Sequence, residues 1–182
     1  MSFPLETDRL LLRCFRSTDL EEFHAYRSDP RVAQYQGWDV PYELETAQAF
    51  IDEMKSAQPG TPGKWFQAAI EFKATQTLLG DCAFHIMASD TRQAYIGFTL
   101  GVTHWKKGYA EEACRSLLDY LFGELNLHRV IAECDVENTA SYRLLERLGF
   151  RREAHLIEDI WFKGSWGSEF HYGLLEREWK KA

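Results

Sequence analysis

Apolar residues recur along this chain with two different periods, and the two periods mark the expected elements. Helical spacing of the apolar positions occurs in four segments, 19–28, 43–57, 108–122 and 138–148. Alternating or continuous apolar stretches, typical of strands, occur in seven others, 9–14, 65–72, 78–87, 93–100, 127–134, 155–162 and 169–176. The pattern predicts a mixed protein with six to seven strands and about four helices.

The order of these segments predicts how the strands pair. Three strands follow one another across short polar turns at 73–76 and 88–92, which favours an antiparallel meander. The helix over 108–122 separates two later strands, and a crossover of this kind joins parallel neighbours. We therefore expect an α/β (α+β) fold with a mixed, mostly antiparallel central sheet. No repeat, low-complexity tract or linker interrupts the pattern, so residues 1–182 are expected to form a single domain.

The composition narrows the class of protein. A chain of 182 residues with 45% apolar and 27% charged residues fits a globular domain. No apolar run approaches the roughly 18 residues of a membrane span, and the N-terminus does not resemble a signal peptide. We expect a cytoplasmic protein without a membrane partner. The net charge of −7 argues against nucleic acid as the main partner and is compatible with a cationic substrate.

Several common catalytic and metal-binding motifs are missing from the sequence. The four cysteines, Cys14, Cys82, Cys114 and Cys134, are scattered in apolar surroundings without metal-ligand spacing. We expect buried, reduced thiols and no bound metal. The segment 59–64 imitates a phosphate-binding loop but lacks its glycine spacing, and no Gly-x-Ser-x-Gly motif occurs.

The most informative segment is 104–110, which reads His-Trp-Lys-Lys-Gly-Tyr-Ala between a strand and an amphipathic helix. The first N–H groups of a helix have no intrahelical partner, and with the helix dipole they form a site for an anion such as phosphate. Two lysines beside the glycine add positive charge, although an ordinary solvated helix start remains an alternative. A second unit follows at 138–141 and opens a helix that ends at 148–150, where capping alone could explain the first residue, Asn138.

Together these motifs resemble the GNAT superfamily of acetyl-CoA-dependent N-acetyltransferases. Residues 105–110 resemble its pyrophosphate loop, and 138–141 with 148–150 resemble its next motif. Two further segments, 7–13 and 172–179, resemble the ribosomal-protein N-terminal (Rim-type) branch. The resemblance spans the chain. It implies direct transfer of an acetyl group from acetyl-CoA to a primary amine in a ternary complex, by a monomer or homodimer without a metal. The amine is either a protein N-terminal α-amine or that of a small molecule.

The resemblance also implies which residues bind the cofactor. The backbone at 100–102 would pair with the pantetheine arm, and the N–H groups of 107–110 would hold the pyrophosphate. Trp105 departs from the glutamine or arginine usual at its position. The expected cofactor-binding residues are Leu100, Val102, Trp105, Lys106, Lys107, Gly108, Tyr109, Ala110, Asn138 and Ser141.

Acetyl transfer needs a group that donates a proton to the leaving thiolate. Many members of the superfamily use a tyrosine, and this chain has Leu145 in its place. The Rim-type resemblance assigns that role to Ser141, with Tyr142 as a second choice. The missing tyrosine also leaves open a different class of function, a CoA-binding sensor or interaction module without turnover.

The acceptor side is less well marked in the sequence. The resemblance places a carboxylate beside the acceptor, and Glu158 is the expected base. Glu169, His85 and Glu71 remain open as alternatives. The aromatic and acidic segments 35–39 and 157–169 are expected to line the acceptor groove, where tryptophans suit an apolar or a cationic acceptor.

Overall fold

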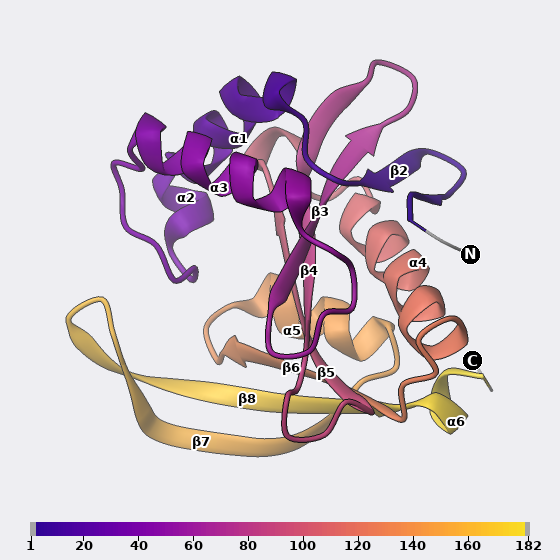
Figure 1. Cartoon of the computed structure of the whole chain (residues 1–182). Helices are drawn as coiled ribbons and strands as arrows, with labels where there is room; N and C mark the ends of the chain where they lie inside the picture. Colours follow the sequence, from indigo (N-terminus) through magenta and orange to yellow (C-terminus); the bar gives the residue numbers. More distant parts are fainter. Residues whose placement is uncertain (1–2, 181–182) are drawn as a thin grey trace.

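The protein is described by a computed structural model that covers residues 3–180. Its strands form one eight-stranded sheet, which helices flank on both faces (Figure 1). The strands are β1 (Leu5–Glu6), β2 (Leu10–Arg13), β3 (Trp65–Phe72), β4 (Thr77–Ile86), β5 (Gln93–Leu100), β6 (Arg129–Asp135), β7 (Arg151–Phe162) and β8 (Ser165–Leu175). The helices are α1 (Leu20–Arg27), α2 (Pro30–Ala33), α3 (Leu44–Ser56), α4 (Tyr109–Gly123), α5 (Thr139–Arg147) and α6 (Glu176–Trp179), with 3₁₀ turns η1 (Ser17–Asp19) and η2 (Val102–His104).

The sheet has one parallel pair, as the crossover helix predicts. Its strand order is β1-β2-β3-β4-β5-β6-β8-β7, and every neighbouring pair except β5 and β6 is antiparallel. The two parallel strands pair only where Gln93–Tyr95 faces Arg129–Ile131. Beyond Tyr95 the two strands diverge. On the side that faces β6, Ile96 to Leu100 therefore have no strand partner within residues 3–180, although β4 pairs with them on the other side. This divergence opens a gap in the middle of the sheet.

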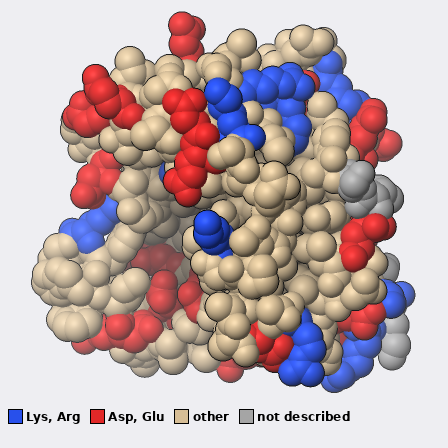
Figure 2. Space-filling view, in the orientation of Figure 1, with Lys and Arg blue, Asp and Glu red and all other residues tan. Residues whose placement is uncertain are grey.

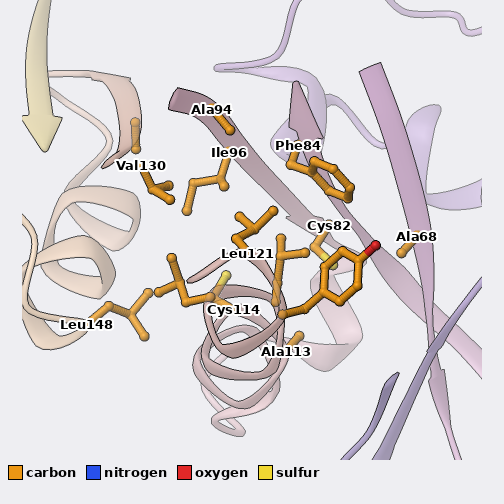
Figure 3. Packing of buried hydrophobic residues seen from close by; sticks show 14 of the residues in the cluster. Ala68, Cys82, Phe84, Ala94, Ile96, Ala113, Cys114, Leu121, Val130 and Leu148 are labelled. Carbon is orange, nitrogen blue, oxygen red and sulfur yellow. The ribbon is translucent and has the colours of Figure 1, made fainter. Parts of the chain in front are cut away.

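Alternating side chains of β3 show how the two faces of the sheet are covered. Ala68 and Ile70 belong to the larger core, which α4 and α5 complete with their apolar faces. Ala69, between them, points to the opposite face and packs with residues of α1 and α3 in the smaller core. This is the period of two that a strand imposes. Figure 3 shows the larger core from close by, where Cys114 and Leu121 of α4 lie against Cys82 and Ile96 of the sheet.

The strands β7 and β8 form a long hairpin that extends from the sheet below α1, α2 and α3 (Figure 1). Its pairing is interrupted between Leu156 and Ile160, where three residues of β7 lie opposite one of β8. The last pair, Phe162 with Ser165, closes on a two-residue turn. The outer edge of β7 has no strand neighbour in the described part of the sheet. A hairpin of this kind has few buried contacts of its own to hold its tip in place.

The structure confirms the predicted fold class, with more short elements than the sequence indicates. The unpredicted β1, α2 and α6 have between two and four residues each, too few to show a period. The strand β7 begins at Arg151 rather than near His155, because its first residues are charged or exposed and do not alternate. The cysteines are free thiols, three of them buried and Cys14 half-buried. No helix between residues 3 and 180 is long and apolar enough to cross a membrane.

Candidate functional site

A cavity of about 780 Å³ lies at the gap between β5 and β6. The end of β5, residues 98–100, forms its floor, and the starts of α4 and α5 form two walls. The segment 31–36, comprising most of α2 and the loop after it, closes the cavity from a fourth side. Burial raises the pKa of Tyr35 in this segment, and the nearby carboxylates of Asp135 and Glu137 raise it further. The segment 31–36 therefore faces the start of α5 across the cavity.

The N-terminus of α4 presents main-chain donors to this cavity. Gly108 precedes the helix with a φ of +79°, a left-handed conformation that glycine adopts without steric cost. Lys106 is also left-handed, with a φ of +61°. The first N–H to bond back to the loop is that of Glu112, which donates to the Gly108 carbonyl at 3.1 Å. The N–H groups before it have no intrahelical partner, and no side chain caps this helix start.

An N-terminal brace, formed by Thr7 and Arg9, fixes this helix start from behind. The Glu112 carboxylate accepts hydrogen bonds from the Thr7 hydroxyl at 2.6 Å, the Arg9 backbone N–H at 2.9 Å and Arg9 Nε at 2.6 Å. Arg9 Nη1 also donates to the Lys107 carbonyl at 3.1 Å. Burial of Glu112 opposes ionisation, yet these hydrogen bonds lower its pKa overall. A Cβ on Gly108 would lie 3.3 Å from Arg9 Nη2, so the brace leaves little room for a larger residue there.

Sequence reasoning did not find this brace. Thr7 and Arg9 lie in the segment 7–13, which is quoted above only as a mark of the Rim-type branch. The segment 7–13 itself was visible in the sequence. Its contact with α4 was not, because Arg9 and Glu112 are 103 residues apart and no local pattern connects them.

Most of the expected cofactor residues line the cavity, and two do not. Those that line it are Leu100, Trp105, Lys106, Gly108, Tyr109, Ala110, Asn138 and Ser141. Val102 instead packs against the smaller core, and Lys107 contributes its carbonyl to the brace. Trp105 donates its indole N–H to the Leu100 carbonyl at 2.8 Å. This bond occupies the last acceptor of the open β5 edge, so the strand-like edge ends at Leu100.

Cationic side chains gather around the cavity in an otherwise acidic protein. The lining includes Arg31, Lys106, Arg143 and Arg147, which come from three different segments. Positive side chains beside unpaired helix N–H groups suit a ligand that carries several phosphate groups. The pKa of His104 is lowered by burial and by the charge of Lys107.

The start of α5 brings Asn138 and Ser141 to the opposite wall. The Asn138 side chain accepts a hydrogen bond from the Ser141 N–H at 3.2 Å, which confirms its expected role as a helix cap. Ser141 is half-buried and borders the cavity. Leu145, at the position of the usual tyrosine, is 1% exposed in the core. Tyr142 is turned toward Phe170, with ring centroids 5.8 Å apart, and is not among the lining residues.

An acidic group lies on the strands next to the gap. Asp159, Glu169 and His171 offer ligand atoms that all lie within 4.8 Å of one another. Burial raises the pKa of Glu169, and the carboxylates of Glu133 and Asp159 raise it further. His171 Nδ1 lies 3.6 Å from Glu133 Oε1. Such a group suits an ammonium ion or a metal ion, so the expected absence of a metal stays a prediction.

The interruption in β7 decides which acidic residue joins this group. Glu158 has a φ of +49° and its N–H donates to the Ser168 hydroxyl at 2.9 Å. Its side chain is exposed, and it does not line the cavity. Asp159, the next residue along β7, lies with Glu169 and His171 instead.

The remaining base candidates lie elsewhere. Glu71 is buried and bonded to Arg13 Nε at 2.6 Å and to Arg16 Nη1 at 3.0 Å. His85 lies on β4 beside Trp65, with ring centroids 5.3 Å apart. Neither of the two lines the cavity at the gap.

The geometry fits an elongated ligand with a phosphate-bearing end. The open edge of β5 offers main-chain groups to an extended amide-bearing arm, as an added strand would use them. The α4 start and the cations offer donors to phosphate oxygens. The acidic group on β7 and β8, together with Glu133 of β6, offers negative charge to a cation. A site of this kind can bring an anionic carrier and a cationic acceptor together at one gap.

The comparisons with known proteins agree with this geometry. The profile of the family described as "Acetyltransferase (GNAT) domain" matches residues 9–151. The uncharacterized N-acetyltransferase YnaD of Bacillus subtilis is 34% identical over 175 residues, covering 96% of this chain and 98% of its own. Spermidine N(1)-acetyltransferase of Vibrio cholerae is 35% identical over 161 residues, covering 86% and 87%. The crystal structure of a GNAT-family acetyltransferase from Bacillus anthracis aligns with a TM-score of 0.87 at 32% identity, covering 97% and 100%.

Proposed function

The chain belongs to the acetyltransferase (GNAT) domain family and is an acetyl-CoA-dependent acetyltransferase, and from this premise we propose how its own residues carry out the transfer. The acceptor is a cationic primary amine, which enters the gap between β5 and β6 from the side of the acidic group. Bound acetyl-CoA would supply an acetyl thioester, an acyl group already activated toward an amine.

The observation that carries this proposal is the arrangement at the gap. The open edge of β5, from Ile96 to Leu100, would hold the pantetheine arm. The α4 start around Gly108 would hold the pyrophosphate, and the cations Arg31, Arg143 and Arg147 would neutralise further phosphate charge. Each of these groups borders the same cavity, which supports one continuous binding site rather than separate patches.

Ser141 is proposed as the proton donor to the leaving thiolate. It borders the cavity on the wall opposite α4, and Asn138 fixes the turn that carries it. The buried Leu145 has no proton to give. As the carbon–sulfur bond breaks, the Ser141 hydroxyl would transfer its proton to the sulfur, which releases the CoA thiol, and would take a proton back from solvent.

A carboxylate is proposed to take the proton from the ammonium before attack. Glu158 stays a prediction, because its side chain is exposed and does not line the cavity. Glu169 does not line the cavity either, but it lies beside Asp159 and His171, and burial and neighbouring carboxylates raise its pKa toward the range in which a base works best, so we propose it ahead of Glu158. The pH dependence of kcat/KM in Glu169→Gln and in Glu158→Gln distinguishes the two assignments.

Direct attack of the amine on the thioester is proposed, without an acyl-enzyme. Among the four cysteines, Cys134 is the nearest to Ser141 in sequence. Burial raises the pKa of its thiol to about 11, although a hydrogen bond with the Ser141 side chain lowers it in part. A thiol with that pKa is almost entirely protonated near neutral pH and is a poor nucleophile. The amine itself is then the nucleophile.

The acceptor class follows from charge. Asp159, Glu169 and Glu133 would attract an ammonium group and stabilise it before deprotonation. The relative that acts on spermidine makes a polyamine a natural first acceptor to try. The Rim-type assignment, with a protein N-terminal α-amine as acceptor, stays a prediction supported by the segments 7–13 and 172–179.

The experiment that tests the function measures thiol release from acetyl-CoA over a panel of amines. The panel contains spermidine, N-terminal peptides, free amino acids and aminoglycosides. We expect release with a cationic amine and loss of that release in Gly108→Glu. Thermal stabilisation of the wild type by acetyl-CoA, without thiol release for any amine, would contradict transfer to the acceptors proposed here.

A further inference from the structure

Lys163, in the turn of the β7–β8 hairpin, joins two parts of the molecule that are far apart in sequence. Its ammonium group donates to the Ala33 carbonyl and to the Trp38 carbonyl, both at 2.7 Å. Ala33 ends α2, and Trp38 lies in the loop that follows. The turn residues Lys163 and Gly164 have φ values of +47° and +89°, which gives the tight turn that directs the side chain to this loop.

The segment that Lys163 contacts is the one that closes the cavity at the gap. Arg31 and Gln34 line that cavity, and they also line a second, shallower cavity of about 460 Å³ that Lys163 borders. The segment 31–38 therefore has the proposed active site on one side and Lys163 on the other. Any change in its position alters the width of the site.

The other attachment of this segment is to α1. The Trp38 ring stacks on the buried Arg27 guanidinium, whose carbon lies 3.7 Å from the ring centroid. The Trp38 indole N–H also donates to the Arg27 carbonyl at 2.9 Å. The inner end of the segment is thus fixed in the smaller core. Lys163 supplies two hydrogen bonds that join the segment to the hairpin.

The hairpin tip has little else to hold it. Trp161 and Trp166 pack on each other, with centroids 5.5 Å apart, but remain 61% and 59% exposed. Ile157 is 72% exposed. Regions with few buried apolar contacts open at low free-energy cost. Two bonds from one ammonium group are therefore a large share of what closes the tip on the loop.

We propose that Lys163 is a latch that closes the mouth of the acceptor site and selects slender amines over bulky ones. Figure 2 shows a hollow between the helices α1 to α3 and the hairpin, with acidic groups inside it. A slender cationic chain would reach Glu169 and Asp159 with the latch closed, whereas the bulkier N-terminus of a peptide would require it to open. Lys163 acts here through the segment 31–38, so it is a positioning residue. The proposal rests on the proposed function.

The test compares Lys163→Met and Lys163→Arg with Lys55→Met. Lys55 is a matched control, because its ammonium also bonds a distant residue, the Ser17 hydroxyl at 2.9 Å, but lies on α3 and does not border the cavity. The measurements are kcat and KM for acetyl-CoA, for spermidine and for a heptapeptide with a free N-terminus.

We expect Lys163→Met to raise the KM for spermidine about tenfold, because loss of the charged hydrogen bonds that hold segment 31–38 to the hairpin leaves the site closed for less of the time. The KM for acetyl-CoA changes less than the KM for spermidine, because Arg31 is only one of several groups proposed to hold the phosphates, and the preference for spermidine over the peptide falls. Lys163→Arg restores most of the preference, because a guanidinium can bond the same carbonyls. An unchanged KM for spermidine and an unchanged preference in Lys163→Met would overturn the proposal.

Amide hydrogen exchange separates failure of the latch from failure of the proposed function. In Lys163→Met the amides of 31–38 and 157–167 should exchange faster than in the wild type and in Lys55→Met. Equal exchange in all three proteins would show that Lys163 does not hold the segments together. If the wild type acetylates neither acceptor, the proposed function fails, while the exchange result still decides whether the latch exists.

Discussion

The two sides of the gap are built on different principles. The proposed cofactor side consists of main-chain donors at the start of α4, fixed by the left-handed Gly108 and by the brace from Arg9 to Glu112. The proposed acceptor side consists of side chains on a loop and a hairpin, which Lys163 joins. A carrier that stays the same can be bound by the backbone. An acceptor that differs between relatives must be recognised by residues that can change without altering the sheet.

The largest expected effect comes from Gly108→Val, which breaks the cofactor side. A branched residue at a φ of +79° is strained by about 1–3 kcal/mol, and its side chain would crowd Arg9 and the proposed phosphate site. We expect acetyl-CoA affinity to fall at least about a hundredfold, as measured by calorimetry. Gly123→Ala is the control, since a Cβ there has no neighbour within 4 Å. Equal affinity in Gly108→Val and the control would show that the α4 start does not hold the cofactor.

Ser141→Ala tests the chemistry between the two sides. Loss of the proposed proton donor should lower kcat about a hundredfold, the lower end of the usual contribution of a general acid. Acetyl-CoA affinity should stay within about twofold of the wild type, because most binding groups lie on α4 and β5. Ser116→Ala, in the middle of α4 and outside the cavity lining, serves as the comparison. Unchanged turnover in Ser141→Ala would remove Ser141 from the mechanism.

The pH dependence of the rate tests the acceptor side. A base works in its deprotonated form, and the pKa of Glu169 is raised, so kcat/KM should fall as the pH decreases through that raised pKa. In Glu169→Gln this acidic limb should disappear and the rate should fall about tenfold to a hundredfold. Loss of the limb in Glu158→Gln instead would assign the base to Glu158.

Glu112→Gln has a smaller expected effect and concerns the cofactor side alone. The amide keeps the shape but loses the charge that Thr7 and Arg9 bond. We expect acetyl-CoA binding to weaken about tenfold, because the helix start is less firmly held, and stability to fall by about 1–2 kcal/mol. Glu176→Gln, which removes an exposed pair with Lys180 on α6, is the control. Thermal unfolding with and without acetyl-CoA measures both quantities.

The same contrast explains what the sequence could predict. The phosphate loop, the two helix starts and the parallel crossover each occupy a short, continuous segment, so their residue types and spacing are visible in one pass. Gly108 and Asn138 were found in this way; in the structure Gly108 precedes α4 in a left-handed conformation and the Asn138 side chain caps α5, while their roles toward the cofactor stay predictions.

The acceptor side could not be predicted in the same detail, because its contacts join distant segments. The bonds of Lys163 to Ala33 and Trp38 span 130 and 125 residues. The interruption in β7 also shifts its register against β8, so alternation alone does not predict that Asp159 joins Glu169 and His171. Neither feature has a local signature in the sequence.

The most direct measurement varies acetyl-CoA and the amine together in the wild type, Glu112→Gln and Lys163→Met. We predict intersecting double-reciprocal lines, as expected when both substrates bind before transfer. Glu112→Gln should raise mainly the KM for acetyl-CoA, and Lys163→Met should raise mainly the KM for the amine. Parallel lines, or the same KM raised in both variants, would contradict a single gap with a cofactor side and an acceptor side.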